Sequence, residues 1–181
     1  MRRILLLVIL CLLAVATTGC KKARLRAQLK ELMGSTIVLP EKISCVYNGE
    51  VFPMPDSLRD RPKLIVYIDS TECTTCRISR IEMYRPLYNI ANETQRFSLL
   101  LLLANKDLSG IPLIQYLRDM EIDMILYVDN DNRFSELNSV MCSDARLHSV
   151  LVDETGKPQV VGDPSRSDRI MSLFSKRINY E

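Results

Sequence analysis

Residues 64–76 read LIVYIDSTECTTC, and they decide the fold. The run from Leu64 to Asp69 is short, apolar and rich in β-branched residues, which is typical of a buried strand. A polar loop follows it, and apolar residues then recur at helical spacing over residues 78–88. Cys73 and Cys76 therefore lie where a buried strand gives way to a helix.

A cysteine at such a junction has distinctive chemistry. A thiolate at a helix N-terminus faces unpaired backbone N–H groups and the positive end of the helix dipole, which lower the pKa of the thiol. Cys76 lies about one turn deeper than Cys73, close enough to close a disulfide ring. We therefore predict that Cys73 is the exposed nucleophile and that Cys76 resolves a mixed disulfide. Glu72 has the opposite effect on the pKa of the neighbouring Cys73, because a nearby carboxylate opposes thiolate formation.

The rest of the chain alternates between strand and helix patterns, which predicts an α/β sheet with crossover helices. We expect the last helix to turn Leu173 and Phe174 toward the core. Strands are expected over residues 35–39, 43–52 (a hairpin turning at Asn48-Gly49), 64–69, 97–103, 124–128 and 148–161 (a second hairpin), and further helices over residues 109–120, 133–137 and 165–179.

The first twenty residues, MRRILLLVILCLLAVATTGC, have three parts. Arg2 and Arg3 are positive, residues 4–16 are apolar, and the small residues 17–19 precede Cys20. This order is typical of a secretory signal peptide. The apolar run is shorter than the roughly 20 residues of a membrane span. An uncleaved membrane anchor is the alternative interpretation.

Cys20, directly after Thr-Thr-Gly, resembles the lipobox cysteine of bacterial lipoproteins, with Thr17 where leucine is usual. The resemblance implies that the signal is cut before Cys20 and that its sulfur is acylated, as with palmitate. We expect an anchor in the cell envelope that faces the periplasm, with the outer or inner membrane left open. The chain then divides into a signal peptide (1–19), a lipid-anchored basic tether (20–34) and one domain (35–181).

The tether sequence KKARLRAQLKELM predicts a short amphipathic helix over residues 21–33. Its apolar residues recur at helical spacing, and five basic residues share the segment. Beside a lipid anchor they favour anionic headgroups, and a solvated helix is the alternative. The apolar positions are Leu25, Leu29, Leu32 and Met33, and the basic ones are Lys21, Lys22, Arg24, Arg26 and Lys30.

The charge balance argues against a nucleic-acid partner. The formal net charge is +2, from 24 basic and 22 acidic residues. Arg2 and Arg3 lie in the signal, which holds no acidic residue, so the remaining chain has 22 of each. A neutral domain has no general electrostatic reason to bind nucleic acid.

The strand LIVYID followed by CTTC, the hairpin SVLVDETGKPQVV and the final helix resemble the thioredoxin superfamily, in particular periplasmic TlpA-like and other thioredoxin-like lipoproteins. The resemblance covers residues 35–181. It implies a thioredoxin-like fold, with a central mixed β-sheet flanked by helices, and a redox-active disulfide between Cys73 and Cys76. This sequence departs from the superfamily at Glu72, where tryptophan is common, and at Leu147 or His148, where a cis-proline is common.

The resemblance further implies a membrane-tethered periplasmic thiol–disulfide oxidoreductase that needs no cofactor. Its partners are envelope proteins that contain thiols or disulfides, and the membrane through the lipid anchor. A structural disulfide, a metal (copper) or cofactor-assembly chaperone, and a non-catalytic envelope module are the alternatives. For metal binding, His148, Cys45 and Cys142 are the further candidates, but we assign no metal ligand. Three roles are open for Cys45 and Cys142: a second disulfide, inert burial or the relay of electrons. A disulfide or inert burial is favoured over the relay.

Overall fold

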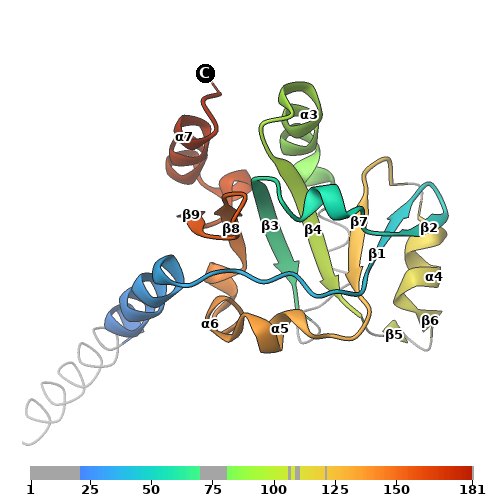
Figure 1. Cartoon of the computed structure of the whole chain (residues 1–181), viewed down its shortest axis with the longest axis horizontal. Helices are drawn as coiled ribbons and strands as arrows, with labels where there is room; N and C mark the ends of the chain where they lie inside the picture. Colours follow the sequence, from blue (N-terminus) through green and yellow to red (C-terminus); the bar gives the residue numbers. More distant parts are fainter. Residues whose placement is uncertain (1–20, 70–80, 106, 109–110, 121, 181) are drawn as a thin grey trace, which may run out of the picture.

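A computed structural model describes residues 21–69, 81–105, 107–108, 111–120 and 122–180. Its main sheet has seven strands in the order β2-β1-β7-β4-β3-β8-β9 (Figure 1). The strands are β1 (Ile43–Tyr47), β2 (Glu50–Pro53), β3 (Lys63–Ile68), β4 (Ser98–Ala104), β7 (Leu126–Asp129), β8 (Ser149–Val152) and β9 (Pro158–Val161), and a separate ladder pairs β5 (Asp107–Leu108) with β6 (Ile111–Pro112).

Helices connect and cover these strands. Residues 21–34 are helical and precede the sheet. The labelled α-helices are α3 (Arg85–Thr94), α4 (Leu113–Arg118), α5 (Phe134–Leu137), α6 (Ser139–Cys142) and α7 (Asp168–Arg177), and the short 3-10 helices are η1 (Asp56–Leu58), η2 (Ile81–Tyr84), η3 (Ala145–Leu147) and η4 (Pro164–Arg166).

The pairing of the strands makes a mixed sheet. At its centre β3, β4 and β7 run parallel, while β8 is antiparallel to β3 and β1 is antiparallel to β7. The predicted turn of the first hairpin is confirmed, since Asn48 and Gly49 both have positive φ angles, of 48° and 76°. The second hairpin, β8 with β9, is confirmed as well. The α/β sheet expected from the sequence is therefore present.

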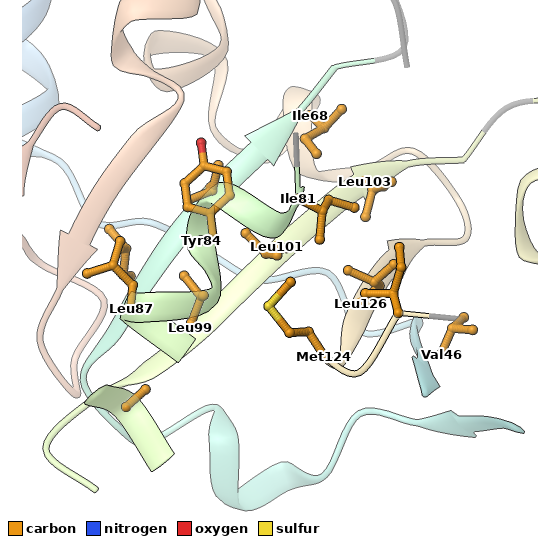
Figure 2. Packing of buried hydrophobic residues seen from close by; sticks show 14 of the residues in the cluster. Val46, Ile68, Ile81, Tyr84, Leu87, Leu99, Leu101, Leu103, Met124 and Leu126 are labelled. Atoms are coloured by element: carbon orange, nitrogen blue, oxygen red, sulfur yellow. The ribbon is translucent and has the colours of Figure 1, made fainter. Parts of the chain in front are cut away.

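Side chains alternate along β3 and build two cores on opposite faces of the sheet. Leu64, Val66 and Ile68 pack with residues of α3, α4 and α7 on one face. Figure 2 shows part of this cluster, with Ile68 of β3 and Leu87 of α3 labelled. Ile65 and Tyr67 pack on the other face with α5, α6 and the helix of residues 21–34. All six residues of β3 are buried, as a strand covered on both faces requires.

The N-terminal helix (residues 21–34) packs against the domain. Leu32 has no exposed surface and lies in the second core, and Leu25 packs against the same core. The Gln28 side-chain amide donates a hydrogen bond to Ser143 Oγ at 2.9 Å. The segment expected to be a tether therefore contributes to the folded core. None of the helices in the described residues combines the length and the apolar character needed to span a bilayer.

Three local expectations are wrong. The helix expected over residues 109–120 is shorter, because Ile111–Pro112 form β6 and α4 covers only Leu113–Arg118. Residues 35–39 form no strand, because Ile37 N–H donates to the Gly156 carbonyl at 2.8 Å and Val38 N–H to Asn138 Oδ1 at 2.9 Å, rather than to a ladder. Leu173 is 48% exposed, whereas its neighbour Phe174 is buried. The hydrogen-bond partners of Ile37 and Val38 lie in a distant turn and on a distant side chain, and the periodicity of residues 35–39 does not reveal them.

Candidate redox site

The cysteines predicted to carry the chemistry, Cys73 and Cys76, lie outside the described residues, as do Glu72 and Cys20. The structure describes the segments that precede residue 70 and follow residue 80. Strand β3 ends at Ile68, Asp69 follows it, and the description resumes at the first residue of η2. In the sequence, the pair therefore belongs to the connection that leaves the central strand β3 and leads to α3.

His148 lies beside the end of β3. It directly precedes β8, whose Ser149 pairs with Val66. The His148 carbonyl accepts a hydrogen bond from Tyr67 N–H at 2.8 Å. Of the two positions considered from the sequence, Leu147 and His148, the second is thus the residue immediately before the strand. No proline stands there, in agreement with the departure noted in the sequence.

Aromatic rings cover one face of the sheet at this end of β3. The ring of Tyr67 lies 4.8 Å from that of Phe134, and its edge meets the ring of His148 at 5.5 Å, measured between centroids. His148 is 3% exposed, and burial raises the pKa of Tyr67. These rings form a packed wall, which limits access to the end of β3 from that face.

The opposite face is apolar at the same end. Figure 2 shows Ile68, Ile81 and Leu103 there, where β3 and β4 stop. Tyr84, at the end of η2, donates its hydroxyl to Asp163 Oδ2 at 2.8 Å. Burial and the nearby Asp163 raise the pKa of Tyr84. The chain that returns from the predicted cysteine pair is thus fixed both to the core and to the segment after β9.

Two aspartates lie near the aromatic wall. Asp129 ends β7 with no exposed surface, and its Oδ2 accepts the Phe134 N–H at 2.7 Å. Burial raises the pKa of Asp129. Burial, together with the charges of Asp69 and Asp129, raises the pKa of Cys142 to about 12. The electrostatic field near Cys142 therefore opposes a thiolate.

Cys45 and Cys142 are both free thiols. Cys45 lies on β1 with 1% of its surface exposed, and burial raises its pKa to about 11. Both cysteines contact the second core. Of the roles left open by the sequence, the structure supports inert burial for Cys45, whereas Cys142 is partly buried. The raised pKa of each thiol favours its protonated form at neutral pH. Among the described residues, no three histidine, cysteine or acidic side chains form a group that could hold a metal ion.

Comparison with known proteins supports the fold. No family model and no curated protein matches the chain. The structure is similar to the crystal structure of the thioredoxin domain of a thiol-disulfide oxidoreductase from Bacteroides vulgatus, with a TM-score of 0.53 over 81% of this chain and 97% of that one. The fold is thioredoxin-like. The sequences of the two chains are 16% identical.

Within this thioredoxin-like fold, sequence reasoning missed the wall that Tyr67, Phe134 and His148 form. The alternation along β3 predicts only that Tyr67 points to one face. Its neighbours come from segments that follow it in the chain by more than sixty residues, and a single sequence does not show such pairing.

Proposed function

We propose that this chain is a membrane-tethered, periplasmic thiol–disulfide oxidoreductase whose dithiol is Cys73 and Cys76. One observation carries the proposal: the CTTC motif occupies the connection that leaves the central strand β3 of a thioredoxin-like sheet. The similar domain from Bacteroides vulgatus belongs to a protein described as a thiol-disulfide oxidoreductase, which supports the same chemistry here.

The reaction is an exchange of thiols and disulfides. The Cys73 thiolate attacks a disulfide of the substrate, forms a mixed disulfide and releases one substrate thiolate, which takes up a proton. The Cys76 thiolate then attacks Cys73 and releases the second substrate thiol. The substrate disulfide is thereby reduced to two thiols and the Cys73–Cys76 pair is oxidised. A second dithiol protein of the envelope must supply the two electrons that restore the pair.

The two cysteines among the described residues support the choice of Cys73 and Cys76 as the reactive pair. Cys45 and Cys142 have raised pKa values of about 11 and about 12, so they do not compete as nucleophiles at neutral pH. The exchange requires only thiols and disulfides, so the proposal includes no cofactor. Attachment through an acylated Cys20 would hold the dithiol at the membrane, where the substrates are exported proteins.

Serine variants test the assignment. We expect Cys76→Ser to accumulate mixed disulfides with envelope proteins, because the resolving thiol is absent, and Cys73→Ser to trap almost none. Non-reducing electrophoresis followed by mass spectrometry measures the adducts. A strongly reducing potential of the wild-type pair would support the reductase direction, which the TlpA-like resemblance favours.

Matched controls are available within the chain. Cys45→Ala and Cys142→Ala remove a thiol without touching the pair, and we expect both to give the adduct pattern of the wild type. Equal trapping by Cys73→Ser and Cys76→Ser, or trapping by neither, would contradict the proposed roles.

A further inference from the structure

An open apolar groove lies at the β9 edge of the sheet. It has a volume of about 500 Å³ and is bounded by the N-terminal helix, β9 and α7. Three of its apolar side chains are unusually exposed: Leu29 by 38%, Met33 by 37% and Leu173 by 48%. We call it the β9 groove, and its lining consists of Leu29, Met33, Gln159, Val160, Val161, Leu173, Lys176 and Arg177.

Basic residues follow the groove along the N-terminal helix. Each residue of an α-helix is rotated by about 100° from the one before it. Leu29 and Met33 therefore share one flank with Lys22, Arg26 and Lys30, all five within an arc of about 100°. These five side chains are exposed. The apolar flank that faces the groove is thus continuous with three cations.

Helix α7 repeats this arrangement on the other side of the groove. Arg169, Leu173 and Arg177 are spaced four residues apart, and Lys176 lies three residues beyond Leu173, so the four share one face. All four are exposed. Arg177 also donates a hydrogen bond to Gln159 of β9, which holds its guanidinium at the rim.

The two helices that flank the β9 groove are basic, and the rest of residues 21–181 is acidic. The N-terminal helix and α7 together carry eight basic and two acidic residues, a net charge of +6. Residues 21–181 carry 22 of each, so the rest of this part has 14 basic and 20 acidic residues, a net charge of −6. None of the described residues that line the β9 groove is acidic. The groove is therefore an apolar strip between two basic flanks on an otherwise acidic protein.

We propose that the β9 groove and its basic flanks dock on an anionic lipid bilayer. An exposed apolar strip bordered by lysine and arginine is the pattern of surfaces that lie at the headgroup level of a membrane. The position in the chain favours this occupant, because the described part of the N-terminal helix starts directly after Cys20 in the sequence and is about 20 Å long. The inference thus rests on the lipid anchor proposed above, but not on the redox chemistry.

Docking would orient the domain. In the sheet order, β9 and β2 form the two edges (Figure 1). The contact directs the β9 edge toward the bilayer and the β1–β2 hairpin away from it. The end of β3 at Ile68 then faces sideways, along the membrane surface. Acyl chains at Cys20 alone would not fix this orientation, since they hold the chain at one point.

Hydroxyl-radical footprinting of the full chain, produced in bacteria and reconstituted in nanodiscs, tests the proposal. One set of discs contains phosphatidylcholine, and the other contains about one-third phosphatidylglycerol. We expect oxidation of Leu29, Met33 and Leu173 to fall about threefold in the anionic discs relative to the neutral ones. Met83 and Leu137, which are 46% and 43% exposed on other elements, serve as internal controls and should not change.

Charge variants supply the second arm. Arg169→Gln, Lys176→Gln and Arg177→Gln combined should abolish the protection at Leu173. The matched control removes three exposed cations elsewhere, at Lys42, Arg118 and Arg133. It should keep the protection, because it changes the net charge by the same amount but leaves the flanks intact.

Three results would overturn the docking proposal. They are equal oxidation in both lipids, protection that survives loss of the α7 cations, and protection without lipid that rises with protein concentration, which would assign the groove to a second copy of the chain. The mass of the N-terminal peptide reports acylation of Cys20 separately. Failure of the anchor and failure of the docking surface therefore give different results.

Discussion

Asp129 is a charged side chain without exposed surface, at the point where β7 ends and α5 is about to begin. Its Oδ2 accepts the Phe134 N–H at 2.7 Å, so the carboxylate fixes the start of α5 and, through Phe134, one side of the aromatic wall. Burial of the charge has a cost, because the ionised form loses its water, and this raises the pKa of Asp129.

The raised pKa makes a prediction about stability and pH. The folded protein holds the Asp129 proton more tightly than the unfolded chain, so stability falls as the pH rises from the ordinary value of 3.8 toward the folded pKa. Asparagine keeps the acceptor for Phe134 N–H without the charge. We expect Asp129→Asn to raise the free energy of unfolding by about 1 kcal/mol at pH 7. Below about pH 4 the two proteins should be equally stable.

Urea unfolding across a pH series measures this difference. Asp131→Asn, at the exposed carboxylate that pairs with Lys42, is the matched control and should change stability by less than about 0.5 kcal/mol. If Asp129→Asn is less stable than the wild type at pH 7, then the charge of Asp129 holds α5, and the argument from burial is wrong.

Among the elements, the β8–β9 turn shows how local and distant contacts combine. Asp153 Oδ1 accepts from Thr155 N–H and Lys157 N–H, both at 3.0 Å, which closes the turn locally. Gly156 has a φ of +82°, and its carbonyl accepts the Ile37 N–H at 2.8 Å. The turn therefore also holds the extended segment that links the N-terminal helix to β1.

Gly156→Ala tests this junction. A Cβ at Gly156 would lie 2.5 Å from the Ile37 carbonyl oxygen, and the left-handed φ adds strain for any side chain. We expect a loss of about 2 kcal/mol or more in the free energy of unfolding. Gly34→Ala is the control, because no atom lies within 4 Å of its Cβ, and it should change stability by less than about 1 kcal/mol. Equal stability of the two variants would show that the turn adapts to the added methyl group.

The same elements show what a single sequence can predict. Continuous apolar runs predict β3 and β4 because a strand buried on both faces needs apolar residues at every position. The Asn48-Gly49 pair predicts its hairpin because the turn requires two positive φ angles. Residues 35–39 have strand-like composition, but their hydrogen bonds go to Gly156 and Asn138, and composition does not identify distant partners.

At the scale of the whole molecule, the sequence predicts where the candidate site lies among the strands better than it predicts which side chains pack around that position. The order of apolar runs locates β3 and β8 in the sequence. The sequence then shows that CTTC follows the central strand β3 and that no proline directly precedes β8. The wall of Tyr67, Phe134 and His148 depends on how three separate segments pack, so it required the structure. The roles of Cys73 and Cys76 themselves stay predictions.

The attachment of the N-terminal helix decides whether the proposed anchor at Cys20 and the thioredoxin-like domain would move together. Leu32 of this helix has no exposed surface, whereas Leu29, three residues earlier, is 38% exposed. We expect Leu32→Ala to lower the free energy of unfolding by about 3 kcal/mol, because it leaves a cavity in the second core. Leu29→Ala should cost less than about 0.5 kcal/mol. Chemical denaturation of the two variants measures both values.

The comparison of Leu32→Ala with Leu29→Ala distinguishes a helix that is a free tether from a helix that is part of the folded domain. If Leu32→Ala is as mild as Leu29→Ala, then the helix is a free tether, and the domain samples many orientations at the membrane. If Leu32→Ala is strongly destabilising, then the helix is part of the domain, because its side chain completes the core beside β3. A lipid anchor at Cys20 would then act on the rigid body that holds β3, and a redox pair after β3 would be presented at a restricted height above the bilayer.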